Sequence, residues 1–548
     1  MTAPILRVED LTVAFGSGHE PVVAGVSFEV APGECFAIVG ESGSGKSVTA
    51  RTLLGLAGAG ARVDATTLEL QGKSVLGNRD RDWRRIRGRE VGFVLQDALV
   101  SLDPLRTVGR EIAETLRLHR FGSRTKRRER VLELLTSVGV PDPELRARQL
   151  PHELSGGQRQ RALIASAIAL DPPLLIADEP TTALDVTIQA QILDLLAAMK
   201  ERGTGLILIS HDLSVVSRLA DRVAVMRHGL LVEQGPVADV LSAPSHPYTQ
   251  TLLDAIPAAH RKGTRLSAVA PTPTDPVVIR PPSGGVLLEA TNLVKRFRGP
   301  DGVERTAVND VSFSIGVGET LGIVGESGSG KTTTAQLVLA LLTPDEGTVR
   351  LGGDVWSEAT EAQRRPRRRQ ISVVYQDPLG SFDPRWTVRR IVEDAVPAEL
   401  YPDGAARRQR AIQLLVDVGL SEEHLDRRPL LLSGGQRQRV AIARALAPEP
   451  SLIVCDEPVS ALDVTIQAQV LDLLADLQER LGLSYLFISH DLGVIHHVAD
   501  RVLVMREGRV VETGTAAEIF GAPRDPYTRQ LLASLPLAEP EPVSGGSA

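Results

Sequence analysis

The chain carries Gly40-Glu41-Ser42-Gly43-Ser44-Gly45-Lys46-Ser47 and, in its second half, Gly325-Glu326-Ser327-Gly328-Ser329-Gly330-Lys331-Thr332. Both stretches fit the phosphate-binding loop pattern G-x-x-x-x-G-K-[ST]. In that loop, backbone N–H groups surround a β-phosphate and the lysine reaches the β- and γ-phosphates. The hydroxyl of Ser47 or Thr332 would bind Mg²⁺. One match can arise by accident, but two matches in matching surroundings indicate two nucleotide sites.

The residues on either side of each loop predict the strand and the helix that the motif requires. Short apolar runs at 35–39 and 320–324 predict buried strands, and 48–56 and 333–342 predict helices whose N-termini favour a bound phosphate. The expected nucleotide-binding residues of the two loops are Gly40, Ser42, Gly43, Ser44, Gly45, Lys46, Ser47 and Val48, and Gly325, Ser327, Gly328, Ser329, Gly330, Lys331, Thr332 and Thr333.

Length and composition exclude several classes of protein. A chain of 548 residues exceeds the usual size of one hydrophobic core, so two or more domains are expected. The net charge of -7 argues against nucleic-acid binding driven by bulk charge. Two cysteines, Cys35 and Cys455, cannot form a disulfide framework or ligate an iron–sulfur cluster. No apolar stretch reaches the roughly 18–20 residues that span a membrane, and 1–13 does not resemble a signal peptide, so a cytosolic location is expected.

The two halves are a duplication. Equivalent residues recur at nearly constant spacing, such as Lys46 with Lys331 and His211 with His490. The spacing is far longer than the repeats of a solenoid, so each copy is a domain. We expect a first domain at 1–257, a proline-rich, extended linker at 258–285, a second domain at 286–536 and a disordered tail at 537–548.

A second motif recurs after a helical region in each half. Ser155-Gly156-Gly157-Gln158 and Ser433-Gly434-Gly435-Gln436 each stand where a helix is predicted to begin. A serine and two glycines at a helix start suit either a second anion site or an ordinary N-cap.

Each half also has an apolar strand that ends in two acidic residues, Asp178-Glu179 in the first and Asp456-Glu457 in the second. Ligands of nucleotide-binding sheets lie beyond the carboxyl ends of the strands. The first acid of each pair would hold Mg²⁺, and the second would face the γ-phosphate and polarise the attacking water. Paired acids at a strand end are otherwise helix caps, but their recurrence beside a phosphate loop favours the catalytic interpretation.

Histidines follow a further apolar strand in both halves, His211 in Ser-His-Asp and His490 in its copy. A lone histidine would be structural by default, whereas two at matching places predict sensors of the γ-phosphate. His496 and His497 have no matching pair and are interpreted as a helix surface, not as a metal site.

Two other features leave alternatives open. Phe15 and Phe297 lie upstream of the loops, where an aromatic ring would stack on adenine or belong to the core. The arginine-rich segments 79–89 and 364–369 suit a solvated face or, as the alternative, a contact with nucleic acid. Each segment precedes a strand that ends in a glutamine, Gln96 or Gln376.

Together these motifs resemble those of the ATP-binding cassette ATPases over nearly the whole chain. The resemblance implies two tandem P-loop cassettes of the α/β class, each with a mixed RecA-like sheet, an antiparallel β subdomain and an α-helical subdomain. It implies head-to-tail pairing of the cassettes, with Lys46 facing 433–436 and Lys331 facing 155–158. ATP and Mg²⁺ are the implied ligands.

The resemblance also implies a role for individual residues. Phe15 and Phe297 match the adenine-stacking aromatic, which is more often tyrosine in that family. The other implied roles are Mg²⁺ contact and relay to a membrane partner (Gln96, Gln376), catalytic glutamate (Glu179, Glu457), switch histidine (His211, His490) and communication across the dimer (Asp185, Asp463). Both sites are complete, so two competent sites are expected.

A finer resemblance is to the fused ATPases of dipeptide, oligopeptide and nickel importers. It rests on Ser101-Leu102-Asp103-Pro104 and Ser381-Phe382-Asp383-Pro384, and on Pro247-Tyr248-Thr249 and Pro526-Tyr527-Thr528. The chain departs from that pattern at Ala98, where the second half has Pro378, and at 430–431, where the first half has His152-Glu153.

This finer resemblance implies a peripheral ATPase on the cytoplasmic face of the cell membrane that powers uptake of peptides or similar small solutes. Its partners would be two membrane-spanning permease subunits and an extracytoplasmic solute-binding protein, with no nucleic acid. The alternatives are a soluble tandem ATPase that acts on ribosomes or DNA, and an exporter motor.

Overall fold

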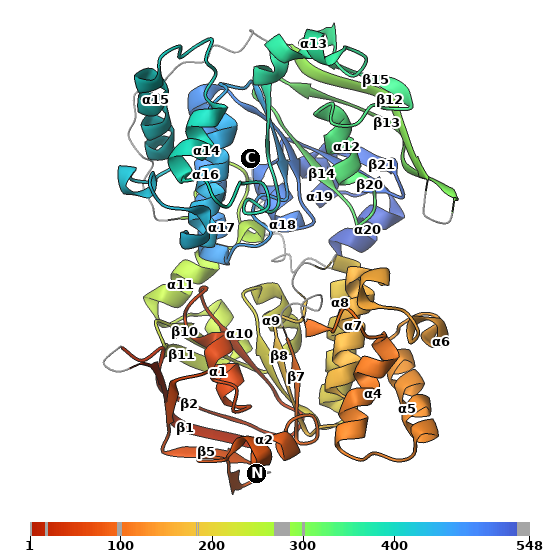
Figure 1. Cartoon of the computed structure of the whole chain (residues 1–548), viewed down its shortest axis with the longest axis vertical. Helices are drawn as coiled ribbons and strands as arrows, with labels where there is room; N and C mark the ends of the chain where they lie inside the picture. Colours follow the sequence, from red (N-terminus) through yellow and green to blue (C-terminus); the bar gives the residue numbers. More distant parts are fainter. Residues whose placement is uncertain are drawn as a thin grey trace, which may run out of the picture. The chain divides into compact units, whose positions relative to one another are not determined.

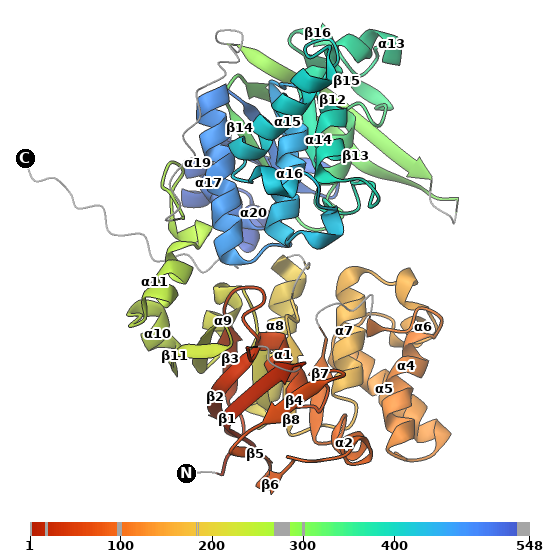
Figure 2. The ribbon, with the colours of Figure 1, turned by 60° about the vertical axis from the view of Figure 1, so that its left-hand side comes forward.

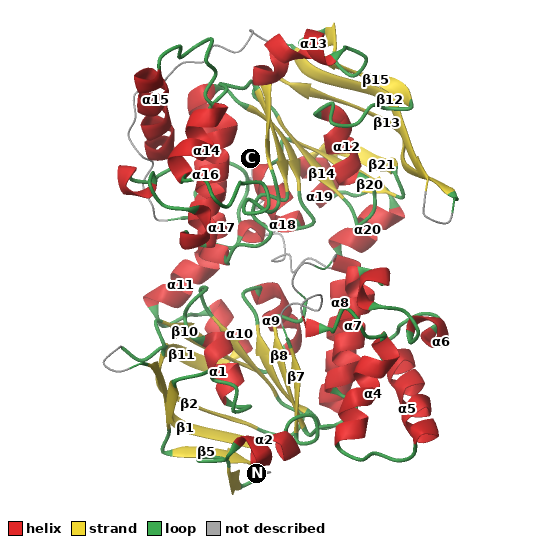
Figure 3. Cartoon of the chain, in the orientation of Figure 1, coloured by secondary structure: helices red, strands yellow, loops and turns green. Residues whose placement is uncertain are grey.

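The computed structural model describes residues 3–16, 20–95, 101–181, 184, 186–267, 285–298 and 302–533. The chain forms two compact units, Met1–Leu253 and Asp254–Ala548, and the boundary falls at the end of helix α11 (Pro247–Asp254). Figure 1 shows the two units, and Figure 3 shows that each contains both sheets and helices. The expected linker from 268 to 284 and the expected tail at 537–548 lie outside the described residues.

A six-stranded mixed sheet forms the centre of the first unit, in the order β11-β10-β3-β9-β8-β7. All neighbouring strands pair in parallel except β10 and β11, which form an antiparallel hairpin. Their bounds are β3 (Cys35–Val39), β7 (Val91–Val94), β8 (Leu174–Asp178), β9 (Gly205–Ile209), β10 (Arg222–Arg227) and β11 (Leu230–Pro236). Every residue of β3, β8 and β9 is buried, as uninterrupted apolar runs predict for strands covered on both faces.

An antiparallel sheet packs on one face of this mixed sheet through a shared hydrophobic core. It contains β1 (Leu6–Phe15), β2 (Val23–Val30), β4 (Ala61–Asp64), β5 (Thr67–Leu70) and β6 (Lys73–Ser74). Figure 2 shows these strands on one side of the unit and a group of helices on the other. The helices of the unit are α1 (Lys46–Thr52), α2 (Asp80–Ile86), α4 (Val108–Leu118), α5 (Arg124–Ser137), α6 (Pro143–Arg146), η1 (Pro151–Glu153), α7 (Gly156–Ala167), α8 (Val186–Glu201), α9 (Leu213–Leu219), α10 (Val237–Ser242) and α11.

The second unit repeats this architecture. Its mixed sheet runs β17-β18-β19-β14-β20-β21 and its antiparallel sheet β13-β12-β15-β16. The strands are β12 (Val286–Arg298), β13 (Glu304–Gly316), β14 (Thr320–Val324), β15 (Glu346–Leu351), β16 (Asp354–Val355), β17 (Ile371–Val374), β18 (Leu452–Asp456), β19 (Ser484–Ile488), β20 (Arg501–Arg506) and β21 (Arg509–Thr515). The repeated sheets confirm the predicted fold class.

The helices of the second unit form a matching set. They are η2 (Pro257–Ala259), α12 (Lys331–Val338), α13 (Glu361–Arg364), η3 (Arg365–Gln370), α14 (Val388–Ala395), α15 (Gly404–Asp417), η4 (Glu422–His424), η5 (Pro429–Leu431), α16 (Gly434–Leu446), α17 (Val464–Leu481), α18 (Leu492–Val498), α19 (Ala516–Gly521) and α20 (Pro526–Leu532). In the part of the chain that the structure describes, no helix is both long and apolar enough to cross a bilayer.

The helices after the phosphate loops differ from their predicted bounds. Both α1 and α12 begin two residues earlier than predicted, at the motif lysine, and both end four residues earlier. The backbone turns into the left-handed region at Gly55 (φ 63°) and at Ala340 (φ 50°), so the helical pattern cannot continue there. The apolar residues at 53–56 and 339–342 therefore lie in the turn after each helix.

Two expectations about the second half are wrong. His497 does not belong to an exposed helix surface, because it is buried. The segment 257–267 that covers it is not extended linker: it includes η2 and packs on the second unit. The composition of the expected linker did not predict the buried contacts of its first residues.

Candidate functional site

Each phosphate loop wraps around its own lysine. The Nζ atom of Lys46 donates to the carbonyl oxygens of Gly40 and Glu41, both at 2.7 Å, and Lys331 makes the same two contacts with its own loop. The lysines are only 7% and 6% exposed. Carbonyl oxygens thus hold each buried ammonium inside its loop, which suits a site that receives an anionic phosphate.

The first glycine of each loop is required by close packing. Gly40 has φ 145°, and a Cβ there would lie 2.1 Å from the carbonyl oxygen of Met226. Gly325 has φ 150° and would clash with Met505 at 2.2 Å. In the second loop the Ser329 hydroxyl is buried and has no hydrogen-bond partner among the described residues, so the cradle retains an unused polar group. These features fit a phosphate ligand.

The hydroxyl and the first acid of each site lie side by side. Ser47 Oγ donates to Asp178 Oδ1 at 3.2 Å, and Thr332 Oγ1 donates to Asp456 Oδ1 at 3.4 Å. Burial raises the pKa of both aspartates, and the neighbouring glutamates raise it further. A hydroxyl and a carboxylate in this position are the oxygen ligands that Mg²⁺ takes beside a nucleotide.

The second acid of each pair contacts the predicted histidine. His211 Nδ1 lies 3.1 Å from Glu179 Oε1, and His490 Nδ1 lies 3.0 Å from Glu457 Oε2. Burial opposes protonation of His490, but the hydrogen bond and the charge of Glu457 outweigh it and raise the histidine pKa. The same balance raises the pKa of His211. Burial alone would raise the pKa of Glu457, yet His490 and Lys331 lower it overall.

Both glutamates hold an unusual backbone conformation. Glu179 and Glu457 each have φ 50°, in the left-handed region that non-glycine residues seldom occupy. Their amides donate at 2.9 Å to Ile209 and Ile488 of the neighbouring strand, which fixes the turn. Strain kept at the same residue in both copies is typical of a functional position.

The predicted glutamine of the second site joins this group. Gln376 Nε2 donates to Glu457 Oε2 at 2.7 Å, so Gln376, Glu457 and His490 form one polar cluster. Gln96, its counterpart, lies outside the described residues, as does Asp185. Asp463, the counterpart of Asp185, caps α17: its Oδ1 accepts from the Ile466 amide at 3.1 Å and from the Thr465 hydroxyl at 3.0 Å.

Both Ser-Gly-Gly-Gln motifs form helix N-caps. Ser155 Oγ accepts from the Gln158 amide at 3.4 Å, and Ser433 Oγ accepts from the Gln436 amide at 3.2 Å. Each serine and the glycine after it are exposed, while the second glycine, Gly157 or Gly435, packs on the neighbouring helix. The N-cap interpretation is therefore correct, and the exposed face of each helix start remains open to a ligand.

The two aromatic residues differ in their surroundings. Phe15 is partly buried and packs against the core between the two sheets of the first unit. Phe297 is 42% exposed, and Lys295 Nζ lies 5.8 Å from its ring centroid. Phe297 is thus accessible enough for contact with a planar base.

The sequence interpretation gave no role to two tyrosines that reach the phosphate loops. Tyr248 on α11 and Tyr527 on α20 are buried, and their hydroxyls accept from the amides of Glu41 and Glu326 at 3.2 and 3.1 Å. Guanidinium groups of Arg227 and Arg506 lie over their rings. The recurrence of Pro-Tyr-Thr in both halves was the signal in the sequence, but its target became visible only in the fold.

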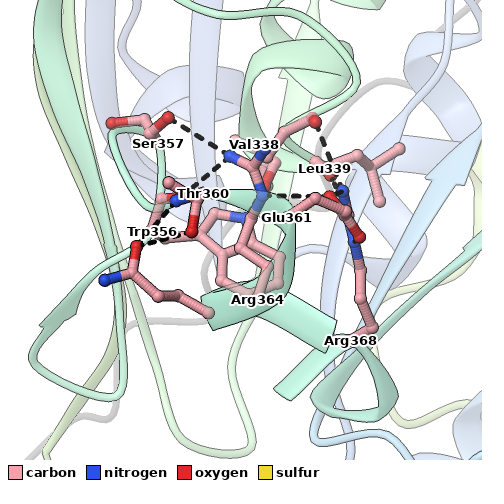
Figure 4. Close-up of polar contacts among 10 residues, drawn as sticks. Val338, Leu339, Trp356, Ser357, Thr360, Glu361, Arg364 and Arg368 are labelled. Carbon is pink, nitrogen blue, oxygen red and sulfur yellow. Dashed lines mark hydrogen bonds and ion pairs between the residues drawn. The ribbon is translucent and has the colours of Figure 1, made fainter. Parts of the chain in front are cut away.

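The arginine-rich segments are more than solvated faces. Arg368 Nη1 donates to Leu339 O at 2.6 Å, at the end of α12, and its other nitrogens contact Glu361 at 3.1 and 2.8 Å (Figure 4). Trp356 Nε1 donates to Val338 O at 2.9 Å beside it. In the first unit Arg87 contacts Leu54 O at 2.8 Å and Gly55 O at 3.0 Å. These arginines therefore cap the C-terminal end of each phosphate-loop helix.

Taken together, two phosphate loops with paired acids, histidines and strained glutamates define a tandem P-loop ATPase. The sequence matches the family described as "ABC transporter" at residues 23–182 and 308–460. It also matches "Oligopeptide/dipeptide transporter, C-terminal region" at 232–284 and 511–543, which include both tyrosines. The chain belongs to the ABC transporter family of ATP-binding proteins.

Known relatives cover the chain from end to end. It is 43% identical to "Oligopeptide transport ATP-binding protein OppD" of Mycobacterium tuberculosis, over 99% of this chain and 100% of that protein. It is 42% identical to "Glutathione import ATP-binding protein GsiA" of Salmonella typhimurium, over 98% and 90% of the two chains. A solved structure, the archaeal ribosome recycling factor aABCE1 in complex with ribosomal stalk protein aP1, shares the fold. Its TM-score is 0.59 at 21% identity, with 91% and 88% of the chains covered.

Proposed function

We propose that this chain is the ATP-hydrolysing subunit of a membrane importer for peptides or similar small solutes. The proposal is supported by relatives named for oligopeptide transport and glutathione import at more than 40% identity over nearly the full length. The match to the oligopeptide/dipeptide transporter C-terminal region in both halves supports it independently. The single structural observation behind it is the contact between a glutamate and a histidine beside the phosphate loop of each unit.

Within each cluster the side chains have separate roles. Glu457 would accept a proton from the attacking water, and His490, which holds its carboxylate, would orient it toward the γ-phosphate. Gln376 would fix the other side of the same carboxylate. Glu179, His211 and Gln96 would do the same in the first site. Bound Mg²⁺ would neutralise charge on the β- and γ-phosphates, held by Ser47, Gln96 and Asp178 in one site and Thr332, Gln376 and Asp456 in the other.

The two cassettes would act as a pair. In this proposal Lys46 shares one ATP with Ser433 to Gln436, and Lys331 shares the other with Ser155 to Gln158, while Asp185 and Asp463 communicate between the sites. Phe15 and Phe297 would stack on the adenines. Because both cassettes lie on one polypeptide, their encounter is intramolecular, at an effective concentration of the order of millimolar. ATP would close the pair, and hydrolysis would reopen it.

The partners follow from the same proposal. Two permease subunits would receive the movement at the surface near Gln96 and Gln376, and an extracytoplasmic solute-binding protein would deliver the solute. The ATPase itself would sit on the cytoplasmic face of the membrane. The likeness to aABCE1 at 21% identity concerns the fold alone and does not favour a ribosomal role.

The proposal is tested by reconstitution. The chain is purified with candidate permease subunits and a candidate solute-binding protein, placed in liposomes and supplied with labelled peptides and internal ATP. We expect ATP-dependent uptake that stops when Glu179 and Glu457 are both replaced by Gln. Export of the label, or ATPase activity stimulated by ribosomes and not by the permease, would contradict the proposal.

A further inference from the structure

The segment 257–267 follows α11 and packs on the second unit. Leu266 is buried in the hydrophobic core of that unit, together with residues of α17 and α18. Ala258 approaches α18 so closely that a Cβ added at Gly493 would lie 2.8 Å from its methyl group. The chain after α11 can be followed beside α17 in Figure 2. The contact is therefore a packed one, with a glycine on the helix that permits it.

A buried carboxylate fixes the end of the segment. Asp472 on α17 is only 4% exposed and accepts from the Leu266 amide at 3.0 Å, the Ser267 amide at 2.8 Å and the Ser267 hydroxyl at 2.6 Å. A buried charge needs such partners, because removing an unpaired charge from water is strongly unfavourable. The segment thus satisfies a group that the second unit cannot leave bare.

Two cations of the segment pair with further acids of the same face. Arg265 contacts both carboxylate oxygens of Asp476 at 3.0 Å, a bidentate arrangement. Lys262 Nζ lies 2.6 Å from Asp500 Oδ2. That same oxygen accepts from the amide of Thr320 at 2.8 Å, where β14 begins and leads into the second phosphate loop.

The first unit satisfies the equivalent acids with its own side chains. Asp194 and Asp221 occupy the places of Asp472 and Asp500, and they pair with Arg218 at 2.8 Å and Lys200 at 2.9 Å. As in the second unit, Asp221 accepts from the first amide of the strand before the phosphate loop, here Cys35 at 2.8 Å. Asp472 and Asp500, and the link from Asp500 to the loop, thus have counterparts in the first unit, whereas Asp476 takes the place of Ala198.

The bases are not common to both copies. The second unit has His497 where the first has Arg218, and Gln478 where the first has Lys200. Gln478 donates to Gly318 O and Thr320 Oγ1 instead, both at 2.9 Å. His497 Nδ1 lies 3.4 Å from the carbonyl oxygen of His260, within the segment. The cations that the second unit lacks are the ones that Lys262 and Arg265 bring.

We propose that residues 257–267 are a docked strap that completes the second cassette, and that the face formed by Asp472, Asp476, Gly493, His497 and Asp500 is the surface built to bind this basic segment. The covalent junction of the two cassettes is the end of α11, not the proline-rich stretch. The strap would have this role whatever solute is transported.

Hydrogen exchange on the full-length chain tests the strap. In the wild type the amides of Leu266 and Ser267 should exchange at least tenfold more slowly than in a flexible peptide. K262Q/R265Q, which changes only partly exposed side chains of the strap, should speed exchange across 257–267 several-fold, and D476N should act from the other side. R218Q, the matched change in the first unit, should leave this exchange unaltered.

A second measurement uses a cut chain. A protease site is inserted between Pro273 and Thr274, and the purified protein is cleaved and run on a sizing column without nucleotide. The strap should hold the two fragments together, and K262Q/R265Q should weaken their association. Wild-type exchange of Leu266 and Ser267 at the rate of a flexible peptide, or fragments whose association ignores K262Q/R265Q, would overturn the proposal.

Discussion

The Nδ1 atom of His490 lies 3.0 Å from Oε2 of Glu457, and His211 repeats this contact with Glu179 at 3.1 Å. In the second unit the same Glu457 oxygen also accepts from Gln376. The carboxylate that we propose accepts a proton from water is thus fixed from two sides. Its backbone is held in the left-handed region as well, so the site depends on geometry that a single substitution can disturb.

The first prediction concerns the two glutamates. E179Q together with E457Q should bind ATP with near wild-type affinity but hydrolyse it about 10²- to 10⁴-fold more slowly, because the amide cannot act as a general base. Phosphate release and fluorescent-ATP binding measure the two quantities separately. E201Q with E479Q, at exposed positions near the ends of α8 and α17, is the matched control. Near-normal turnover in the first double variant would remove Glu179 and Glu457 from the catalytic role.

The second prediction concerns pH. Because folding raises the pKa of His490, protonated His490 stabilises the fold at pH values below its unfolded pKa of 6.5. That stabilisation is lost as the pH rises through the raised pKa. Because folding lowers the pKa of Glu457, ionised Glu457 stabilises the fold at pH values above its unfolded pKa of 4.5. That stabilisation is lost as the pH falls through the lowered pKa. The pair should therefore contribute most at about pH 5–6.

Thermal unfolding of wild type and H490Q across pH 4.5–9 should show this dependence. The difference in Tm should be greatest at about pH 5–6 and shrink toward pH 9, with each kcal/mol worth about 2–4 °C in a domain of this size. H152Q replaces an exposed histidine in η1 and should show no difference in Tm from the wild type at any pH in this range. A Tm difference that grows with rising pH would contradict the charge pairing.

The third prediction concerns the tyrosines that contact the loops. Y248F and Y527F each remove one hydroxyl and leave an amide of the phosphate loop without its acceptor. A neutral hydrogen bond is worth about 0.5–1.5 kcal/mol, so ATP affinity should fall about two- to tenfold while the fold persists. Titration with labelled ATP measures the change. Y401F, which loses a hydroxyl contact to Glu449 in the helical subdomain, should keep wild-type affinity; equal losses in all three variants would argue for a general effect on folding.

The fourth prediction concerns the arginine cap in Figure 4. R368Q removes the charged donor from the end of α12 and leaves Glu361 without its closest partner. We expect a loss of about 1.5–3 kcal/mol in the stability of the second unit, measured by denaturant unfolding. R369Q alters the neighbouring exposed arginine and should change stability by less than about 0.5 kcal/mol. Equal effects of the two substitutions would mean that the whole segment is a solvated face.

The sequence alone determined the class of fold and most of the site. Phosphate loops, terminal acids and helix caps are local patterns, in which a few consecutive residues impose one backbone path. Their duplication made Lys46, Glu179 and His211 equivalent in position to Lys331, Glu457 and His490 before any contact was visible. The short, mainly apolar strands were equally clear, because strands covered on both faces consist mostly of apolar residues.

Only the tertiary structure decided which distant residues meet. Tyr527 reaches Glu326, Arg368 caps α12, and the segment around Arg265 lies on Asp476. Each contact joins elements far apart in the chain, and a hydrogen bond between them depends on how sheets and helices pack rather than on neighbouring letters. His497, which was expected on a helix surface, is buried because the segment 257–267 packs over it. The composition of that segment does not reveal which residues it covers.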